Sequence, residues 1–153
     1  MANRLILASK SPRRYDLLKQ LGLDFEVIPS KIEEDFVPHE SPREHVIRLA
    51  EAKALDVGNQ FLGNWVIGAD TIVYVDGIIL GKPMSREEAM DMLKRLNGKE
   101  HRVLTGISVR HSDEGKGECE AVETAVRMKS LSQVEMDWYI RTGEPFDKDG
   151  GDG

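Results

Sequence analysis

Residues 65–75, WVIGADTIVYV, form an almost continuous apolar stretch. Such a stretch is typical of a strand that is buried on both faces of a sheet. Asp76-Gly77 follows directly and predicts a tight turn into a second strand, IILG at residues 78–81. This part of the chain therefore predicts a β-hairpin whose first strand lies inside a sheet covered by helices.

Further helices and strands are interspersed on both sides of this hairpin. We expect strands at residues 4–8, 24–28, 101–111 and 118–128, and helices beginning after Ser11, Ser41, Ser85 and Ser132. Glutamate stands three residues after the last three of these serines, which predicts capping boxes, and glycines end the helices. The interspersed order, with some hairpins, predicts an α/β fold with a mixed sheet.

Length and composition point to a single globular domain. The 153 residues, 40% of them hydrophobic, suffice for one core. No signal peptide or membrane span is evident, so we expect a cytoplasmic protein. Cys119 is the only cysteine, which excludes an intramolecular disulfide and a cysteine-rich zinc site. The net charge of −6 opposes binding to a nucleic-acid polymer but is compatible with a small anionic ligand.

A cluster of hydroxyl and basic side chains stands where the first strand meets the first helix. Its members are Ser9, Lys10, Ser11, Arg13 and Arg14. Free backbone N–H groups and the helix dipole favour an anion at a helix N-terminus, and arginine can contact two phosphate oxygens at once. Two interpretations fit this segment equally well: a phosphate site, and a simple serine cap with basic residues in solvent.

Asp70 interrupts the apolar strand at residues 65–75. A carboxylate there has a considerable desolvation cost, and perturbed carboxylates cluster at active sites. We therefore favour a function that involves a metal, a cation or a proton. The alternative is a structural carboxylate that bonds a neighbouring turn, with Gly68 marking a bulge.

Two lysines lie where they could reach a ligand. Lys53 lies on the apolar face of its helix, in register with Ala50 and Val57, and could reach into a cleft, although snorkelling along the edge of the core is the more common outcome for such a lysine. Lys82 stands between a glycine and a proline, on a loop that could present it precisely. The acidic run Glu33-Glu34-Asp35 could add an oxygen ligand for a hard divalent cation.

Six motifs together resemble the Maf family of nucleotide pyrophosphatases, first noted as inhibitors of septum formation. In chain order they are SKSPRR at 9–14, EAKA at 51–54, GADT at 68–71, GKP at 81–83, TG at 105–106 and EPFDK at 144–148. The resemblance implies a mixed, twisted sheet with flanking helices and a central cleft, a homodimer, and hydrolysis of a nucleoside triphosphate to monophosphate and pyrophosphate. It also implies that the C-terminal part of the family's domain is missing from residues 1–153.

The same resemblance implies a role for each matching residue. Asp70 would be the general base or a metal-linked carboxylate, and Glu33 a second carboxylate for Mg²⁺ or Mn²⁺. Lys53 and Lys82 would act at the catalytic centre. The expected substrate-binding residues are Ser9, Ser11, Arg13, Arg14 and Thr71.

Thr71 and Arg13 further resemble the branch of the family that acts on dTTP and UTP. A competing hypothesis is a non-catalytic nucleotide-binding regulator of cell division. The two differ in whether bound nucleotide is turned over.

Overall fold

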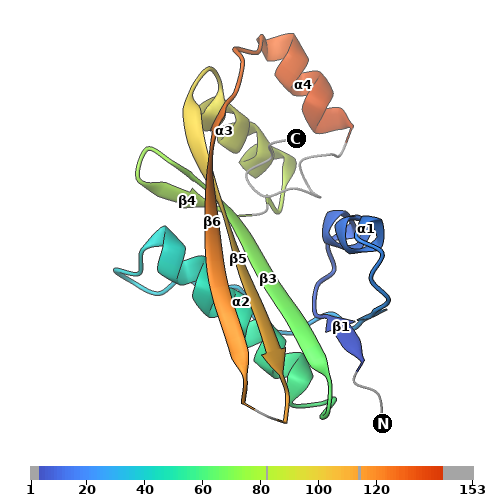
Figure 1. Ribbon diagram of the computed structural model, residues 1–153. Helices are drawn as coiled ribbons and strands as arrows, with labels where there is room; N and C mark the ends of the chain where they lie inside the picture. The colour runs from blue at the N-terminus through green and yellow to red at the C-terminus, as the bar shows by residue number, and fades with distance from the viewer. Residues whose placement is uncertain (1–3, 82, 114, 143–153) are drawn as a thin grey trace. The chain divides into compact units, whose positions relative to one another are not determined.

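The computed structural model describes residues 4–81, 83–113 and 115–142, in which helices and strands are interspersed (Figure 1). In chain order the elements are β1 (Leu5–Leu7), α1 (Pro12–Gln20), β2 (Glu26–Val27), α2 (Pro42–Gly58), β3 (Trp65–Val75), β4 (Ile78–Leu80), α3 (Arg86–Leu96), β5 (Glu100–His111), β6 (Gly117–Arg127) and α4 (Gln133–Arg141). The α/β class predicted from the sequence is confirmed.

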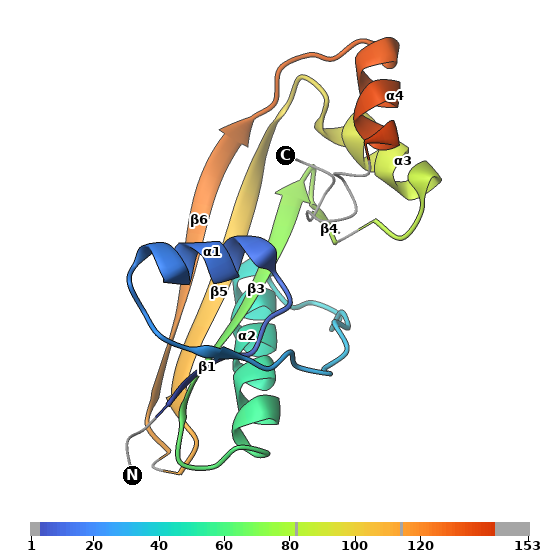
Figure 2. The same ribbon diagram turned by 90° about the vertical axis from the view of Figure 1, so that its right-hand side faces the viewer.

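The sheet is mixed, with the strand order β2-β1-β3-β5-β6. Strand β1 pairs in parallel with β2 and with the first residues of β3, and Figure 2 shows β1 beside the start of β3. Strand β4 pairs antiparallel with the last residues of β3, with Val75 opposite Ile78. The two residues between them, Asp76 and Gly77, have φ of 51° and 78°, as the predicted tight turn requires.

The chain divides into two compact units that share strands β3, β5 and β6. The first unit contains the chain up to Asp70 together with Thr105–Val122, and the second contains Thr71–Leu104 and the chain from Glu123 onward. The sequence predicted a single domain and gave no sign of a division into two units. Most of the candidate site residues belong to the first unit.

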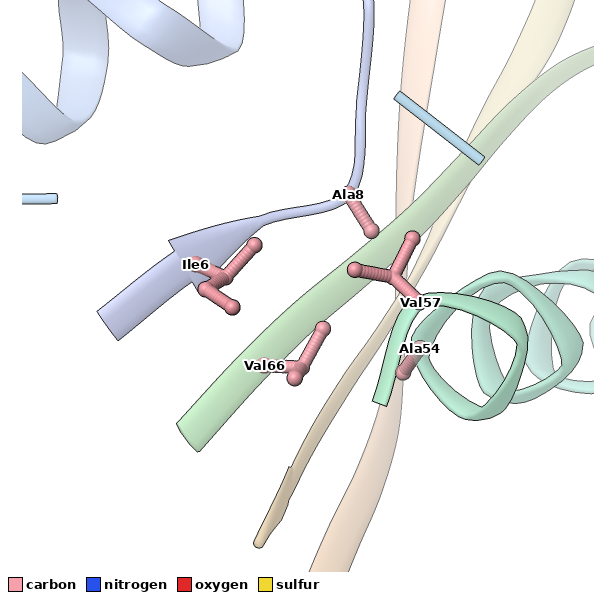
Figure 3. Packing of buried hydrophobic residues seen from close by; sticks show 5 residues of the cluster. All are labelled: Ile6, Ala8, Ala54, Val57 and Val66. Atoms are coloured by element: carbon pink, nitrogen blue, oxygen red, sulfur yellow. The ribbon is translucent and has the colours of Figure 1, made fainter. Parts of the chain in front are cut away.

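In the first unit, helix α2 packs closely on the sheet. Ala54 and Val57 from α2 meet Ile6 and Val66 from β1 and β3, together with Ala8 just after β1, and Figure 3 shows these side chains pointing toward one another. The helix begins with the predicted capping box at Ser41 and Glu44 and has proline at its first position. Burial of this apolar face supplies most of the stability of such a helix.

Two glycines let the backbone of α2 approach the strands. A Cβ atom at Gly68 of β3 would lie 2.2 Å from the carbonyl oxygen of Ala50, and one at Gly106 of β5 would lie 2.3 Å from that of Val46. Real Cβ atoms are not found so close to backbone atoms. The motifs GADT and TG therefore contain the contact points between helix and sheet, and Gly68 serves helix packing.

The second unit has its own apolar clusters. Strands β3 and β4 contribute Val73, Val75 and Leu80, which pack with Leu96 of α3. Helices α3 and α4 meet through Ala89, Leu93, Met136 and Ile140.

Most predicted helix ends agree with the structure, with one correction at α3. Ser132 and Glu135 form the predicted capping box of α4. At α3, Ser85 accepts from the backbone of Glu88, but the Glu88 carboxylate accepts from Met84 N at 2.9 Å instead of completing the box. Strand β2 has only two of the five residues predicted for it.

Among the described residues, no helix is long and apolar enough to cross a membrane.

Candidate active site

The segment between β1 and α1 is folded back on itself by serine hydroxyls. Ser11 Oγ caps the helix by accepting from Arg14 N at 3.3 Å. Ser9 Oγ accepts from Ser11 N at 3.2 Å and from Arg14 Nη1 at 3.0 Å. Arg13 lies exposed in the first turn of α1. The structure thus supports the serine cap and places two guanidinium groups at a helix N-terminus, where an anion is favoured.

The pairing of β1 with β3 brings this segment to the level of Asp70. Leu7 lies opposite Ile67, and Ala8 N donates to Ile67 O at 2.9 Å. Both strands run in the same direction, so Ser9 and Asp70 follow at the carboxyl side of the paired residues. This is the end of parallel strands at which α/β proteins bind ligands.

Asp70 is buried, and its carboxylate is paired with Lys53 of helix α2. The residue is only 3% exposed. Lys53 Nζ donates to Asp70 Oδ1 at 3.1 Å, to the carbonyl oxygen of Ala69 at 3.3 Å and to Glu34 Oε1 at 2.7 Å. Lys53 is therefore directed into the structure from the apolar face of its helix, as one of the two interpretations of the sequence predicted.

Burial raises the pKa of the Asp70 carboxyl above its ordinary range. The positive charge of Lys53 acts in the opposite direction and offsets this rise only in part, and the negative charge of Glu34 adds to it. A carboxyl whose pKa is raised toward neutrality is a better proton acceptor at neutral pH than an exposed one.

A histidine lies on the other side of the same carboxylate. His45, also on α2, has its Nε2 atom 3.9 Å from Asp70 Oδ2 and its Nδ1 atom 3.3 Å from Glu40 Oε1. None of the sequence motifs contains His45. Its spacing of two helical turns from Lys53, on the same face, is the signal that could have identified it.

The oxygen atoms around Asp70 are of the kind that a hard divalent cation prefers. Asp70 Oδ2 is buried and has no hydrogen-bond partner among the described residues, so it has ligand capacity left. Within that part of the chain, no group of three or more His, Cys, Asp or Glu residues forms a cage for a metal. Mg²⁺ is usually held by one or two carboxylates, waters and substrate phosphates, so such a cage is not required.

The structure assigns different positions to the remaining candidate residues. Within the acidic run, both Glu33 and Glu34 are exposed, and Glu34 is the one whose carboxylate contacts Lys53. Thr71 follows Asp70 in β3 and is half-buried. Lys82 and the EPFDK motif lie outside the described residues.

Comparisons with solved structures define the class of fold. The Staphylococcus aureus Ham1 protein is similar with a TM-score of 0.50 and 21% identity, over 82% of this chain and 71% of that one. A HAM1 protein from Coxiella burnetii is similar with a TM-score of 0.51 and 14% identity, over 82% and 73% of the two chains. This chain therefore has the α/β fold of the Ham1 proteins.

Sequence comparison then identifies the family. The family model described as "Maf-like protein" matches residues 4–153, and the chain belongs to this family. Two relatives are named dTTP/UTP pyrophosphatase. The protein from Syntrophus aciditrophicus is 47% identical over 99% of this chain and 74% of its own length. The protein from Symbiobacterium thermophilum is 50% identical over 96% of this chain and 75% of its own length.

Proposed function

We propose that the protein is a nucleoside triphosphate pyrophosphatase that hydrolyses dTTP and UTP to the monophosphate and pyrophosphate. The observation that carries this proposal is the buried Asp70 carboxylate, paired with Lys53 at 3.1 Å near a basic helix N-terminus. Relatives that share nearly half of the sequence, over almost the whole chain, are named for this activity.

In the proposed reaction, Asp70 orients and deprotonates the attacking water. A bond forms between the water oxygen and the α-phosphorus, and the bond from that phosphorus to the bridging oxygen breaks. The electron pair leaves with pyrophosphate, and the proton of the water passes to the Asp70 carboxyl. The raised pKa of this carboxyl favours the transfer.

Cationic groups stabilise the triphosphate and the leaving pyrophosphate. We assign this role to Arg13, Arg14, Lys53 and Lys82, with Ser9 and Ser11 shaping the loop that approaches the phosphates. A divalent cation, Mg²⁺ or Mn²⁺, would be held by Asp70 together with Glu33 or Glu34 and would neutralise phosphate charge. Glu34 is the better placed of the two glutamates because it contacts Lys53.

The preference for pyrimidine nucleotides is proposed from Thr71 and Arg13, which match the dTTP and UTP branch of the family.

Nucleoside triphosphates are cytoplasmic metabolites, so we propose that the protein acts in the cytoplasm. A homodimer, implied by the family resemblance, can be tested by light scattering coupled to size-exclusion chromatography.

The proposal is tested by incubating the protein with each nucleoside triphosphate and Mg²⁺ or Mn²⁺ and identifying the products. Release of pyrophosphate and monophosphate from dTTP and UTP, faster than from purine nucleotides, is expected. Release of orthophosphate would contradict the reaction class. Nucleotide binding by calorimetry without any turnover would support the regulator hypothesis instead.

A further inference from the structure

We propose that Arg48 is a positioning residue, which holds the loop between β2 and α2 against helix α2 so that Glu34 stays beside Lys53. The inference rests on the proposed function, in which Glu34 is a candidate carboxylate for the divalent cation. None of the six sequence motifs contains Arg48. Its role is to act through the loop and not on the substrate itself.

This loop carries the acidic run but has little structure of its own. Residues 28–40 form neither helix nor strand, and the run Glu33-Glu34-Asp35 is exposed throughout. A segment with few buried contacts opens easily. The carboxylate of Glu34 nevertheless lies 2.7 Å from Lys53 Nζ. An ion pair with one exposed partner contributes little, so other contacts are needed to keep the loop in this position.

Arg48 contacts the loop at two points, before and after its turn at residues 38–39. Its Nε and Nη2 atoms lie 2.7 Å and 3.0 Å from the two carboxylate oxygens of Glu40. The guanidinium also donates to Asp35, to Oδ1 at 3.1 Å and to the carbonyl oxygen at 3.0 Å. Bidentate contacts of arginine fix orientation as well as adding energy. Because Asp35 follows Glu34 directly, these bonds hold the backbone next to the carboxylate that reaches Lys53.

Helix α2 also holds the loop on either side of these contacts. Near the end of the helix, Asp56 Oδ2 accepts from Ser30 Oγ at 3.0 Å and from Lys31 N at 3.1 Å. In its first turns, the buried ring of His45 stacks on Phe36, with 5.0 Å between ring centroids and 10° between ring planes. From residue 30 to residue 36 the loop therefore runs antiparallel to α2, with the acidic run between two held ends.

Loss of Arg48 should loosen the loop without displacing the helix. The apolar face of α2 is buried against β1 and β3 by Ala54 and Val57, which do not depend on Arg48. A site that is complete only when the loop is closed binds with an apparent affinity that falls with the closed fraction. The expected effect of Arg48 is therefore on the loop and on cation binding.

The test compares Arg48→Gln and Arg48→Lys with the wild type and with Arg110→Gln. Lysine keeps the charge but cannot make the forked contacts of a guanidinium. Arg110 is the matched control because it also contacts α2, with Nη1 2.8 Å from Glu51 Oε1, and its side chain is 24% exposed against 32% for Arg48. Hydrogen–deuterium exchange with mass spectrometry measures the loop, calorimetry with Mn²⁺ alone measures the cation site, and thermal unfolding shows that each variant is folded.

Arg48→Gln should speed exchange in residues 31–40 about tenfold, the factor of one charge-assisted hydrogen bond, and leave exchange in α2 unchanged. It should weaken Mn²⁺ binding about tenfold, and half-maximal turnover of dTTP should need about tenfold more Mn²⁺. Arg48→Lys should lie between this variant and the wild type. Arg110→Gln should match the wild type in loop exchange and in Mn²⁺ binding.

The outcomes that would overturn the inference differ from those that would contradict the proposed function. Wild-type exchange in the loop of Arg48→Gln would show that Arg48 does not hold the loop. Faster exchange with unchanged Mn²⁺ affinity, or a wild type that binds no Mn²⁺, would overturn the link to the cation. A wild type that binds Mn²⁺ but hydrolyses no nucleotide would contradict the proposed function, while exchange and calorimetry would still decide the role of Arg48.

Discussion

Replacing Gly68 by alanine tests whether the close approach of α2 to β3 builds the site. The new Cβ would lie 2.2 Å from the carbonyl oxygen of Ala50 and 2.8 Å from the nitrogen of Ala54. Carbon and its neighbours prefer separations of about 3.5 Å, so the helix must move by about 1 Å. Both neighbours are helix backbone, which cannot rotate away.

The expected cost is at the upper end of the range for overpacked cores, about 3 kcal/mol. For a chain of this length, that cost corresponds to a decrease of about 6 to 12 °C in Tm. Gly58→Ala, at the last residue of α2, is the control, because its Cβ would meet Ser112 Cβ at an ordinary 3.4 Å. This control should match the wild type or exceed its stability, since alanine favours a helix.

The assay is thermal and urea unfolding followed by circular dichroism, with turnover measured below the transition. Displacement of α2 carries Lys53 and His45 away from Asp70, so folded Gly68→Ala should also lose kcat. Surface substitutions usually change the free energy of unfolding by no more than about 0.5 kcal/mol. If Gly68→Ala changes it by no more than that, the close approach of α2 to β3 is not essential for stability. Loss of stability without loss of kcat would separate packing from catalysis.

Three further changes test the charges of the site. Asp70→Asn should lower kcat by about 10² to 10⁴-fold. Because burial raises the pKa of Asp70, the wild type should lose stability relative to this variant as pH rises above about 4, the ordinary pKa of an aspartate. A difference in unfolding free energy that does not change with pH would argue against the raised pKa. Glu40→Gln should lower the free energy of unfolding by about 1 kcal/mol at pH 7, because Arg48 lowers the pKa of Glu40 and so stabilises the folded protein when Glu40 is ionised. This difference from the wild type should disappear as pH drops below about 4. A difference that persists in acid would exclude the Glu40–Arg48 ion pair as its source. Lys53→Met should raise the pKa of Asp70 further, visible as a shift of the acid limb of the kcat/KM profile to higher pH, and an unshifted limb would contradict the pairing.

Local patterns predicted much of the fold and the central residue of the site. The apolar stretch at 65–75 is a strand with the predicted bounds, because a strand buried on both faces has a composition that few other elements share. Asp70 was identifiable for the same reason, since a carboxylate within such a strand is costly. Ser41 and Glu44 predicted the start of α2 because capping depends on neighbouring residues only.

The remaining features depend on contacts between distant segments. The approach of α2 to Gly68 and Gly106 cannot be inferred from the sequence around either glycine, so the position of His45 beside Asp70 was not predicted. Glu33 and Glu34 are adjacent in a loop without periodicity, and only the structure shows that Glu34 contacts Lys53. Pairing with β1, which extends over two residues, decides the length of β2.

The proposed reaction requires the Asp70 site to direct water to the α-phosphorus of a nucleoside triphosphate. Hydrolysis of dTTP in oxygen-18-labelled water, followed by mass spectrometry of both products, shows which phosphorus the water attacks. We expect the label in the monophosphate, none in pyrophosphate, and almost no labelled product with Asp70→Asn. Label in pyrophosphate, or labelled monophosphate formed equally fast by Asp70→Asn, would contradict it.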